Sequence, residues 1–401
     1  GCHLLYEMTK NAVMGFVQIV PLLAHFRRLV KQAESHLTNH PPDAVLLVDF
    51  PGFNWWIARA AHNRGIPVYY YLPPQLWAWA PWRIRRVRKW VDHVICALPF
   101  EFDWYRSRGV KATWVGHPFF DEVADQQLNV DTVDRLRRDS NHQLLGLLPG
   151  SRTQEIERNW PMMLQVAEKV QRACPHVRWV AACYRPEHRK RCEELQRQSG
   201  LQVEIEYESG QTSEVIEAAD ACFMVSGSVS LELLARHTPG VVLYRTSRLG
   251  RFAARKLLSC RFITLTNLIA DDEVMPEFLS GGDPGDDIQS ITEILTTWCD
   301  HSDALSLQKK RMSELASTAA ATGATRRTAD LLQQRPPALC FCQCSGPGGG
   351  LRYRTRPPAG ETTGRLADDD SNRAEYRCPS PSDGCLRSDY GRRSDDAGHS
   401  G

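Results

Sequence analysis

The sequence has no uninterrupted apolar run of the roughly 18 residues that a membrane-spanning helix needs. It also has little excess charge, because its 401 residues carry a formal net charge of only +2, which argues against a general nucleic-acid binder. It contains neither the P-loop pattern nor the glycine pattern of dinucleotide-binding turns, so a kinase or dehydrogenase has little support. The first residues show no basic region followed by an apolar stretch, so we expect no signal peptide.

Cysteine is plentiful, but paired cysteines are not indicated. Of the 13 cysteines, those before residue 335 occur singly in apolar surroundings, as Cys96, Cys183 and Cys222 do. Such cysteines usually act as small buried apolar groups in a reducing compartment. The cysteines at 340–344 have no second Cys or His cluster at zinc-finger spacing. We therefore expect no metal site.

The sequence does contain a regular alternation of strand and helix patterns. β-branched, aliphatic and aromatic runs predict strands at 44–50, 67–73, 93–99, 112–116, 144–148, 177–184, 203–207, 221–228 and 240–245. Amphipathic stretches predict helices between them, including 55–65, 82–92, 156–173, 187–199 and one from Val229. This alternation predicts an α/β protein with parallel, doubly wound sheets.

Composition divides the chain into three parts. A polar connector at 123–143 separates two sets of strand–helix units, so we expect an N-terminal domain at 1–140 and a second domain at 141–334. After about residue 334 the chain is rich in Gly, Pro, Ser, Arg and Asp and has no apolar period. Such a segment cannot bury enough apolar surface to offset its ordering entropy. We expect 335–401 to be a disordered or spurious tail.

A carboxylate ends the first predicted strand. Asp49 directly follows an aliphatic run and precedes Pro51 and Gly52, which break the strand. Functional sites of parallel sheets lie at the carboxyl ends of the strands, and a carboxylate there can act as a general base toward an attacking hydroxyl group. On position alone, a strand-end Asp that caps the next turn is the more ordinary interpretation.

The turn "PGSR" at 149–152 suits a phosphate group. A strand is expected to end at Leu148, and Ser151 is predicted to cap the helix that follows. The backbone N–H groups of such a helix start favour an anion, and Arg152 adds a fixed cation with forked donors. The alternative is an ordinary capping turn with a surface arginine.

A similar turn follows a later strand. Ser226, Gly227 and Ser228 lie between a strand and a helix, and Glu232 lies one turn inside that helix, where a carboxylate can bind ribose hydroxyl groups. Glu232 can also simply favour the positive helix start. Two anion-binding turns in one domain indicate a nucleoside diphosphate more strongly than either does alone.

Tryptophan and basic residues alternate in the segment 70–90. The residues that we assign to a membrane or lipid surface are Trp77, Trp79, Trp82, Arg85, Arg86 and Arg88. Aromatic and basic side chains together suit an anionic lipid interface, although they also suit stacking on single-stranded nucleic acid. A partly buried helix with a solvated basic face is the third interpretation.

Taken together, these segments resemble the lipid-A-disaccharide synthase family over roughly residues 1–330. The matching segments, in family order, are "YEMTKNAVMGF", "VDFPGFN", "LPPQLWAW", "LPFE", "VGHP", "LLPGSRTQEIE", "VSGSVSLELL" and "LTNLIA" with "PEFL". The resemblance implies a GT-B glycosyltransferase with two Rossmann-like doubly wound domains facing a cleft. It implies the inverting transfer of 2,3-diacylglucosamine from UDP-2,3-diacylglucosamine to 2,3-diacylglucosamine 1-phosphate, which forms the β-1,6 lipid A disaccharide and UDP without a cofactor.

The resemblance also assigns roles to residues. It implies that Asp49 is the catalytic carboxylate and Arg152 the essential arginine. The substrate-binding residues that it implies, together with Ser151, are Ser226, Gly227, Ser228, Glu232, Asn267 and Glu277. The family's first strand and its loop of the type "GEASGD" have no counterpart upstream of "YEM" in this sequence, so we expect the first βα unit to be missing.

Acyl-chain substrates imply peripheral binding to the inner face of the bacterial inner membrane from the cytoplasm, with a homodimer left open. An inactive, truncated fragment is one alternative to an active transferase, and two other functions compete with it. One is another UDP-sugar enzyme on a similar scaffold, such as a UDP-N-acetylglucosamine 2-epimerase, which has no lipid acceptor to dock. The other is a non-catalytic nucleic-acid-binding protein, against which the near-neutral charge and the two phosphate turns speak.

Overall fold

The computed structural model describes residue 6 and residues 23–138, 142–225, 227–247, 260–334 and 339–343, with residues 23, 24 and 339–343 described by their backbone only. The matched segment "YEMTKNAVMGF" therefore lies almost wholly outside the described residues, as does Ser226. Within the described ranges, no helix is both long enough and apolar enough to cross a membrane.

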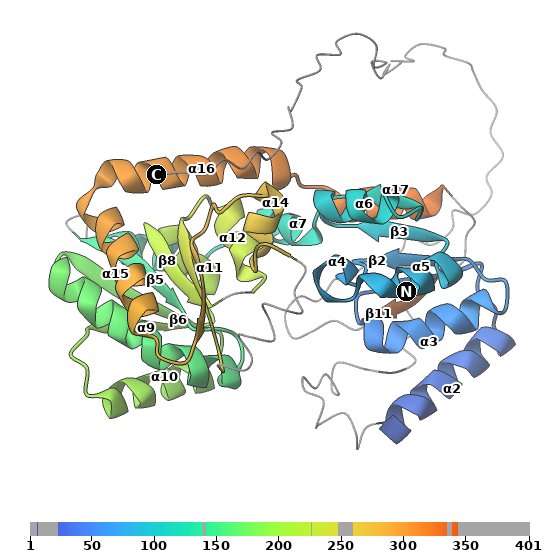
Figure 1. Ribbon diagram of the computed structural model, residues 1–401, viewed down its shortest axis with the longest axis horizontal. Helices are drawn as coiled ribbons and strands as arrows, with labels where there is room; N and C mark the ends of the chain where they lie inside the picture. The colour runs from blue at the N-terminus through green and yellow to red at the C-terminus, as the bar shows by residue number, and fades with distance from the viewer. Residues whose placement is uncertain are drawn as a thin grey trace, which may run out of the picture. The chain divides into compact units, whose positions relative to one another are not determined.

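The first sheet has five parallel strands in the order β11-β1-β2-β3-β4 (Figure 1). Its strands are β1 (Ala44–Val48), β2 (Val68–Tyr71), β3 (His93–Cys96), β4 (Ala112–Trp114) and β11 (Leu339–Gln343). The helices in the same part of the chain are α2 (Leu23–Asn39), α3 (Pro51–His62), α4 (Leu76–Trp79), the 3₁₀ turn η3 (Pro81–Arg83), α5 (Ile84–Trp90) and α6 (Pro99–Arg106). Leu47, Tyr70 and Val94 are fully buried, as expected for strands of a parallel sheet that is covered on both faces.

The second sheet has six parallel strands in the order β10-β9-β8-β5-β6-β7. Its strands are β5 (Gln143–Leu148), β6 (Val177–Cys183), β7 (Ile205–Ser209), β8 (Ala221–Val225), β9 (Gly240–Thr246) and β10 (Glu277–Gly281). The other helices of the described residues are α7 (Pro118–Asp125), α8 (Val130–Arg137), α9 (Thr153–Ala173), α10 (Pro186–Ser199), α11 (Thr212–Ala218), α12 (Val229–Ala235), α14 (Leu265–Ala270), α15 (Gly285–Asp300), α16 (Ser302–Ala319) and α17 (Ala324–Gln333).

The predicted α/β class with two parallel, doubly wound sheets is confirmed. Three differences from the sequence analysis concern the predicted connector, a strand of the second sheet and the predicted tail. The predicted connector at 123–143 carries helix α8, which the side chain of Asn129 caps by accepting the N–H of Thr132 over 3.1 Å. Strand β10 was not expected. Within the predicted tail, residues 339–343 form strand β11, which pairs in parallel with β1.

Helix α17, at the end of the predicted second domain, packs with the first sheet. Leu332 joins a buried cluster with Leu46 of β1 and Ile95 of β3. The guanidinium of Arg327 donates to the carbonyl of Val115 over 2.8 Å. A side chain at Gly116, which has a φ of 86°, would place its Cβ 2.8 Å from that guanidinium, so the turn of the "VGHP" segment needs glycine for this contact.

Candidate active site

The carboxyl ends of four neighbouring strands of the first sheet surround a pocket of about 300 Å³. Its lining residues are Asp49, Pro51, Leu72, Pro73, Pro74, Gln75, Trp79, Ala97, Leu98, Glu101, His117 and Leu265. Asp49 follows β1, Leu72 follows β2, and His117 lies beyond β4. The pocket therefore occupies the sheet edge where parallel α/β folds bind their ligands.

Asp49 lies in a strained turn that the sheet holds in place. Asp49 and Phe50 both have a positive φ, of 46° and 41°, a conformation that residues other than glycine rarely adopt. The N–H of Asp49 donates to the carbonyl of Tyr71 over 3.1 Å, and the hydroxyl of Tyr70 donates to the carbonyl of Asp49 over 2.9 Å. Strain of this kind persists only where surrounding contacts fix it, and such contacts often occur at functional sites.

The carboxyl group of Asp49 reaches the pocket but is not fully hydrated. Its surface is accessible to solvent, yet protein atoms crowd around it, and this desolvation raises the pKa of Asp49 above its ordinary value of 3.8. A hydrogen bond from the backbone of Phe50 opposes the rise. A carboxylate with a raised pKa is a stronger base than a free one, which suits proton removal from a hydroxyl group.

Two further titratable residues line the same pocket, and the sequence analysis assigned no role to either. Glu101 lies in the first turn of α6, and its side chain is 3% exposed. His117 caps α7, where its Nδ1 accepts the N–H of Phe119 over 3.2 Å. Protein surrounds most of this ring, and the desolvation lowers the pKa of His117 to about 4. The ring is therefore neutral at physiological pH, and because Nδ1 accepts, its proton resides on Nε2.

Both predicted anion turns lie at the centre of the second sheet. Strands β5 and β8 are neighbours, with Leu148 paired to Met224. On one side of this pair the chain continues from β5 to β6 and β7, and on the other side from β8 to β9 and β10. The strand order therefore reverses between β5 and β8, and the turns that follow these two strands flank this switch point. Doubly wound folds bind nucleotides at this place. Gly227 and Ser228 belong to the second turn.

The turn after β5 differs from the prediction in its capping. The prediction that Ser151 caps the helix is wrong, because α9 begins at Thr153 with Arg152 in the cap position and no side-chain cap. Instead, Glu155 reaches back, accepts the N–H of Ser151 over 3.0 Å and pairs with Nη1 of Arg152 at 2.5 Å. A side chain at Gly150, with a φ of 107°, would collide with Glu155. An anion at this turn must therefore displace the carboxylate of Glu155.

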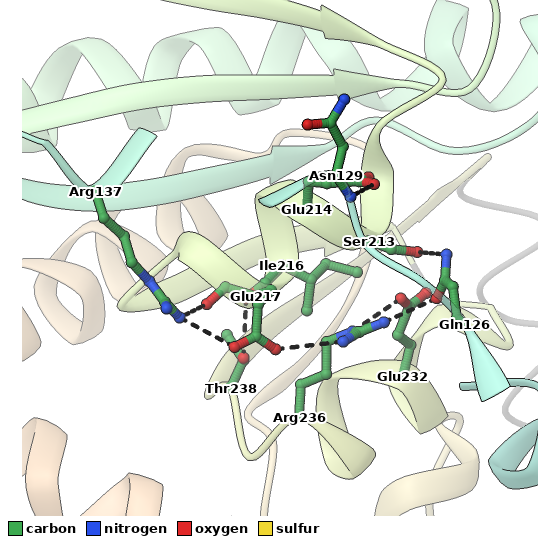
Figure 2. Close-up of polar contacts among 10 residues, drawn as sticks. All are labelled: Gln126, Asn129, Arg137, Ser213, Glu214, Ile216, Glu217, Glu232, Arg236 and Thr238. Carbon is green, nitrogen blue, oxygen red and sulfur yellow. Dashed lines mark hydrogen bonds and ion pairs between the residues drawn. The ribbon is translucent and has the colours of Figure 1, made fainter. Parts of the chain in front are cut away.

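Glu232 takes part in a chain of polar contacts around Arg236, which Figure 2 shows. The guanidinium of Arg236 contacts Glu232 at 3.1 Å, Glu217 at 3.3 Å and the amide oxygen of Gln126 at 2.8 Å. Gln126 in turn donates to the hydroxyl of Ser213 over 2.8 Å. The side chain of Glu232 is nearly buried and paired within its own helix, so a ribose hydroxyl would bind a carboxylate that Arg236 already orients.

Asn267 and Glu277 hold one loop together. One carboxylate oxygen of Glu277 accepts from the N–H of Thr264 and from the amide of Asn267, both over 2.7 Å. Asn267 is fully buried; its amide group also donates to the carbonyl of Met275, and its oxygen accepts the N–H groups of Val274 and Met275. The polar atoms of both side chains are thus bonded within the protein, around the segment that carries Leu265 into the pocket.

The aromatic and basic residues of α4, η3 and α5 do not all face solvent. The prediction that Trp77 faces a membrane is wrong, because the side chain is 8% exposed and its Nε1 donates to Glu101 over 3.2 Å. Trp79 and Trp82 are 41% and 64% exposed. The guanidinium of Arg83 lies over the ring of Trp79, 4.7 Å from its centre. Arg85, Arg86, Arg88 and Lys89 of α5 are exposed, and Arg88 also donates to the carbonyl of Arg108.

Within the ranges that the structure describes, no three His, Cys, Asp or Glu side chains gather closely enough to hold a metal ion. The cysteines at 340–344 are described only in part and without side chains. The absence of a metal requirement stays a prediction.

Comparison with known sequences gives one consistent family. The model of the lipid-A-disaccharide synthetase family matches residues 1–324. Lipid-A-disaccharide synthase of Myxococcus xanthus (strain DK1622) is 32% identical over 333 residues, which cover 83% of this chain and 86% of that protein. Lipid-A-disaccharide synthase 1 of Legionella pneumophila (strain Lens) is 33% identical over 283 residues, covering 70% of this chain and 72% of that protein.

Solved structures with a similar fold are distant in sequence. The UDP co-structure of S. aureus MnaA gives a TM-score of 0.54 at 13% identity and covers 79% of this chain and 84% of that one. UDP-GlcNAc 2-epimerase from Neisseria meningitidis bound to UDP-GlcNAc gives 0.54 at 15% identity, covering 80% and 83%. At these identities the likeness concerns the fold, which is the GT-B fold of UDP-sugar enzymes, and does not favour the epimerase alternative.

Proposed function

Because the chain belongs to the lipid-A-disaccharide synthase family, we propose that its two strand-end sites divide a glycosyl transfer between them. The chain is a glycosyltransferase of lipid A biosynthesis. Its donor is UDP-2,3-diacylglucosamine and its acceptor is 2,3-diacylglucosamine 1-phosphate. The acceptor binds in the Asp49 pocket at the first sheet, and the UDP group binds at the switch point of the second sheet.

The chemical step begins with the 6-hydroxyl group of the acceptor, which is a poor nucleophile until it loses its proton. Asp49 accepts that proton, and the oxygen forms a bond to C1 of the donor sugar. The bond between C1 and the UDP oxygen breaks at the same time, and UDP leaves with the electron pair. Attack from the face opposite UDP inverts the configuration at C1 and gives the β-1,6 linkage.

The observation that carries this assignment is the position of Asp49. Its carboxyl group lines the pocket at the carboxyl edge of a parallel sheet, in a strained turn held by Tyr70 and Tyr71. The partial desolvation that raises the pKa of Asp49 also strengthens it as a base.

UDP binds at the turns that follow β5 and β8. The phosphate groups displace Glu155 and take the N–H of Ser151 and the guanidinium of Arg152, whose forked donors fit phosphate oxygens. The turn of Ser226, Gly227 and Ser228 contributes further N–H groups. Positive charge fixed at this position stabilises the leaving UDP as negative charge develops on it.

Three more residues complete the proposed substrate site. Glu232 binds the ribose hydroxyl groups while Arg236 holds its carboxylate in place. Asn267 and Glu277 act on the substrate by holding the segment 263–277 against the pocket, because their own polar atoms are already bonded. Their role is therefore to position Leu265 rather than to contact UDP.

The acyl chains of both substrates require contact with a lipid surface. We propose that Trp79, Trp82, Arg85 and Arg86 bind the inner face of the bacterial inner membrane. Trp77 is removed from the predicted set because it is buried, and Arg88 because its guanidinium already donates to the carbonyl of Arg108. Trp79 also lines the pocket, so this surface adjoins the proposed acceptor site. The protein would then take its lipid substrates from the membrane without crossing it.

Incubation of the chain with UDP-2,3-diacylglucosamine and ³²P-labelled 2,3-diacylglucosamine 1-phosphate tests the function. We expect a labelled disaccharide and an equal amount of free UDP, and the Asp49→Asn variant should form neither at a comparable rate. Interconversion of UDP-N-acetylglucosamine with its 2-epimer, without a disaccharide, would instead identify an epimerase.

A further inference from the structure

The proposed mechanism leaves one acidic group of the pocket without a role. Glu101 lies in the first turn of α6, the helix that follows β3 in the chain, and its side chain is 3% exposed. Glu101 lines the same pocket as Asp49. A carboxyl group is rarely buried without a function or a cationic partner.

Glu101 has a fixed orientation, but among the described residues no cationic side chain pairs with it. Its Oε1 accepts from the indole N–H of Trp77 over 3.2 Å, and the backbone N–H groups of Ala97 and Leu98 also point to its carboxyl group. Trp77 is itself held, because its ring packs edge-on against Phe100 at 4.9 Å. The carboxyl group is therefore anchored within a residue that forms part of the pocket wall.

The titratable groups around Glu101 cannot compensate a negative charge. Cys96 at the end of β3 and Tyr105 on α6 both become anions when they ionise, and each has its own pKa raised by burial and by Glu101. Across the pocket lie Asp49 and the neutral ring of His117. Burial outweighs the three hydrogen bonds and raises the pKa of Glu101 to about 8. At neutral pH its carboxyl group therefore carries a proton and can donate a hydrogen bond.

We propose that Glu101 is a substrate-recognition residue of the Asp49 pocket, where its carboxyl group hydrogen-bonds a hydroxyl group of the acceptor glucosamine ring while Trp77 fixes its orientation. This inference rests on the proposed function and extends it. It gives the pocket two carboxyl groups with different tasks: Asp49 takes the proton of the attacking hydroxyl, and Glu101 donates to a neighbouring hydroxyl and holds the ring in register. Environments that separate the protonation states of two carboxyl groups are a recurrent way to divide such tasks.

The protonation state of Glu101 can be measured without turnover. The indole N–H signal of Trp77 in a ¹⁵N–¹H spectrum reports on its hydrogen-bond acceptor, and its absence in Trp77→Phe identifies it. We expect that signal to shift between pH 6 and pH 10 with a midpoint near pH 8 in the unsubstituted chain. It should not shift in Glu101→Gln, and in Asp103→Asn, an exposed acidic position on the same helix, the shift should persist. A signal that stays constant in the unsubstituted chain would overturn the proposal.

Kinetics then separate recognition from a merely structural role. Glu101→Leu should raise the KM for the acceptor about 10- to 100-fold and leave the affinity for UDP unchanged, because only the acceptor loses a hydrogen bond. Glu101→Gln keeps a donor and an acceptor, so it should raise this KM less. We also expect the unsubstituted chain to lose affinity for the acceptor above pH 8, and Glu101→Gln to show no such loss. If Glu101→Leu fails to fold, the pH profile of Glu101→Gln alone decides.

Different results would overturn the role of Glu101 and the proposed role of Asp49. Equal changes in acceptor and UDP affinity, or an acceptor KM that neither variant alters, would overturn the role of Glu101 while Asp49→Asn remained inactive. Normal turnover of Asp49→Asn would overturn the proposed mechanism itself.

Discussion

The side-chain amide of Asn54 donates a hydrogen bond to the main-chain carbonyl of Asp49 over 2.7 Å, and a second one to the carbonyl of Val48 over 3.2 Å. Asn54 is fully buried on the first turns of α3, so it ties the start of this helix to the end of β1. Between them lie Asp49 and Phe50, the two residues with a positive φ. Asn54 thus stabilises the turn that presents the proposed base.

We expect Asn54→Ala to weaken both the fold and the reaction. Two carbonyl groups would lose a donor, which should lower the free energy of unfolding by about 1–3 kcal/mol. A turn that relaxes by about 1 Å should lower kcat by about 10- to 100-fold. Chemical denaturation and steady-state kinetics measure the two effects. Asn63→Ala, at the exposed end of the same helix, is the matched control and should change neither. Full activity in Asn54→Ala would show that Asn54 does not position the base.

Asp49→Asn, unlike Asn54→Ala, should lower the activity without lowering the stability of the fold. Loss of a general base lowers kcat by about 10²–10⁴-fold, while UDP affinity should stay nearly constant. Because folding raises the pKa of Asp49, the native state disfavours the ionised carboxylate. This cost is absent below pH 3.8 and is complete once the pH exceeds the folded-state pKa. Asparagine removes the cost and also tolerates a positive φ, so at pH 7 the variant should be at least as stable.

Denaturation curves at pH 7 and activity profiles down to pH 4 check this pair of effects. Asp43→Asn, an exposed position just before β1, serves as the control and should leave both unchanged. A variant with Asn at position 49 that is clearly less stable, or that turns over normally, would make Asp49 a capping residue of the turn.

Arg152 provides a test of the UDP site. Arg152→Ala should weaken UDP binding and lower kcat, because the guanidinium meets phosphate charge that grows as the bond to UDP breaks. Arg152→Lys should restore little, since lysine lacks the forked donor geometry. Calorimetric titration with UDP and steady-state kinetics provide the measurements, and Arg158→Ala, exposed on the same helix, is the matched control. Equal activity of the Arg, Lys and Ala forms would exclude Arg152 from the site.

The network of Figure 2 makes a prediction about stability. Arg236→Ala would leave the nearly buried carboxylate of Glu232 without its cation, which should destabilise the fold by about 3–5 kcal/mol. Arg326→Ala removes an ion pair that is 4.0 Å long and in which the arginine is 89% exposed, so its effect should be close to zero. Thermal or chemical denaturation of both variants gives the comparison. If Arg236→Ala and Arg326→Ala were equally stable, the carboxylate of Glu232 would be hydrated. It could then bind ribose without the help of Arg236.

Much of the fold could be predicted from the sequence, because strands of a parallel sheet are short apolar runs that end abruptly. The runs ending at Val48, Leu148 and Val225 all became strands. Strand β10 was missed because it begins with Glu277, whose carboxylate looks like a surface group in sequence but binds Thr264 and Asn267 in the structure. The local sequence pattern does not show which distant residues a side chain will contact.

The candidate site was predictable only where a residue follows a strand directly. Asp49 meets that condition at the end of β1, and Arg152 was predicted from the turn between β5 and α9, where the structure places it. Glu101 does not meet that condition. Acidic residues are common in the first turn of a helix because they interact favourably with the positive helix start, so nothing in the sequence singled out Glu101. Trp77 and Trp79 are two residues apart in the same segment, so composition could not tell the buried one from the exposed one. Helix α4 turns them to different sides.

The exposed part of that segment leads to the last prediction, which concerns the membrane. Trp79 and Trp82 expose their rings, and Arg85 and Arg86 extend from the adjoining helix. A basic residue near an anionic surface contributes about 1 kcal/mol to the free energy of membrane binding at low salt, so Arg85 and Arg86 together should contribute about 2 kcal/mol. Insertion of the rings should add a part that salt does not screen.

Co-sedimentation with vesicles of phosphatidylethanolamine and phosphatidylglycerol should therefore increase with the fraction of phosphatidylglycerol and fall only partly in high salt. Reversal of charge in Arg85→Glu and Arg86→Glu should remove the salt-sensitive part, and Trp82→Ala should reduce the remainder, with UDP affinity unchanged in each. Lys190→Glu with Arg197→Glu, on the exposed face of α10, is the control of equal charge change and should bind as the unsubstituted chain does. If all variants bound alike, this surface would be a solvated helix face, and the acyl substrates would have to enter the Asp49 pocket from another side.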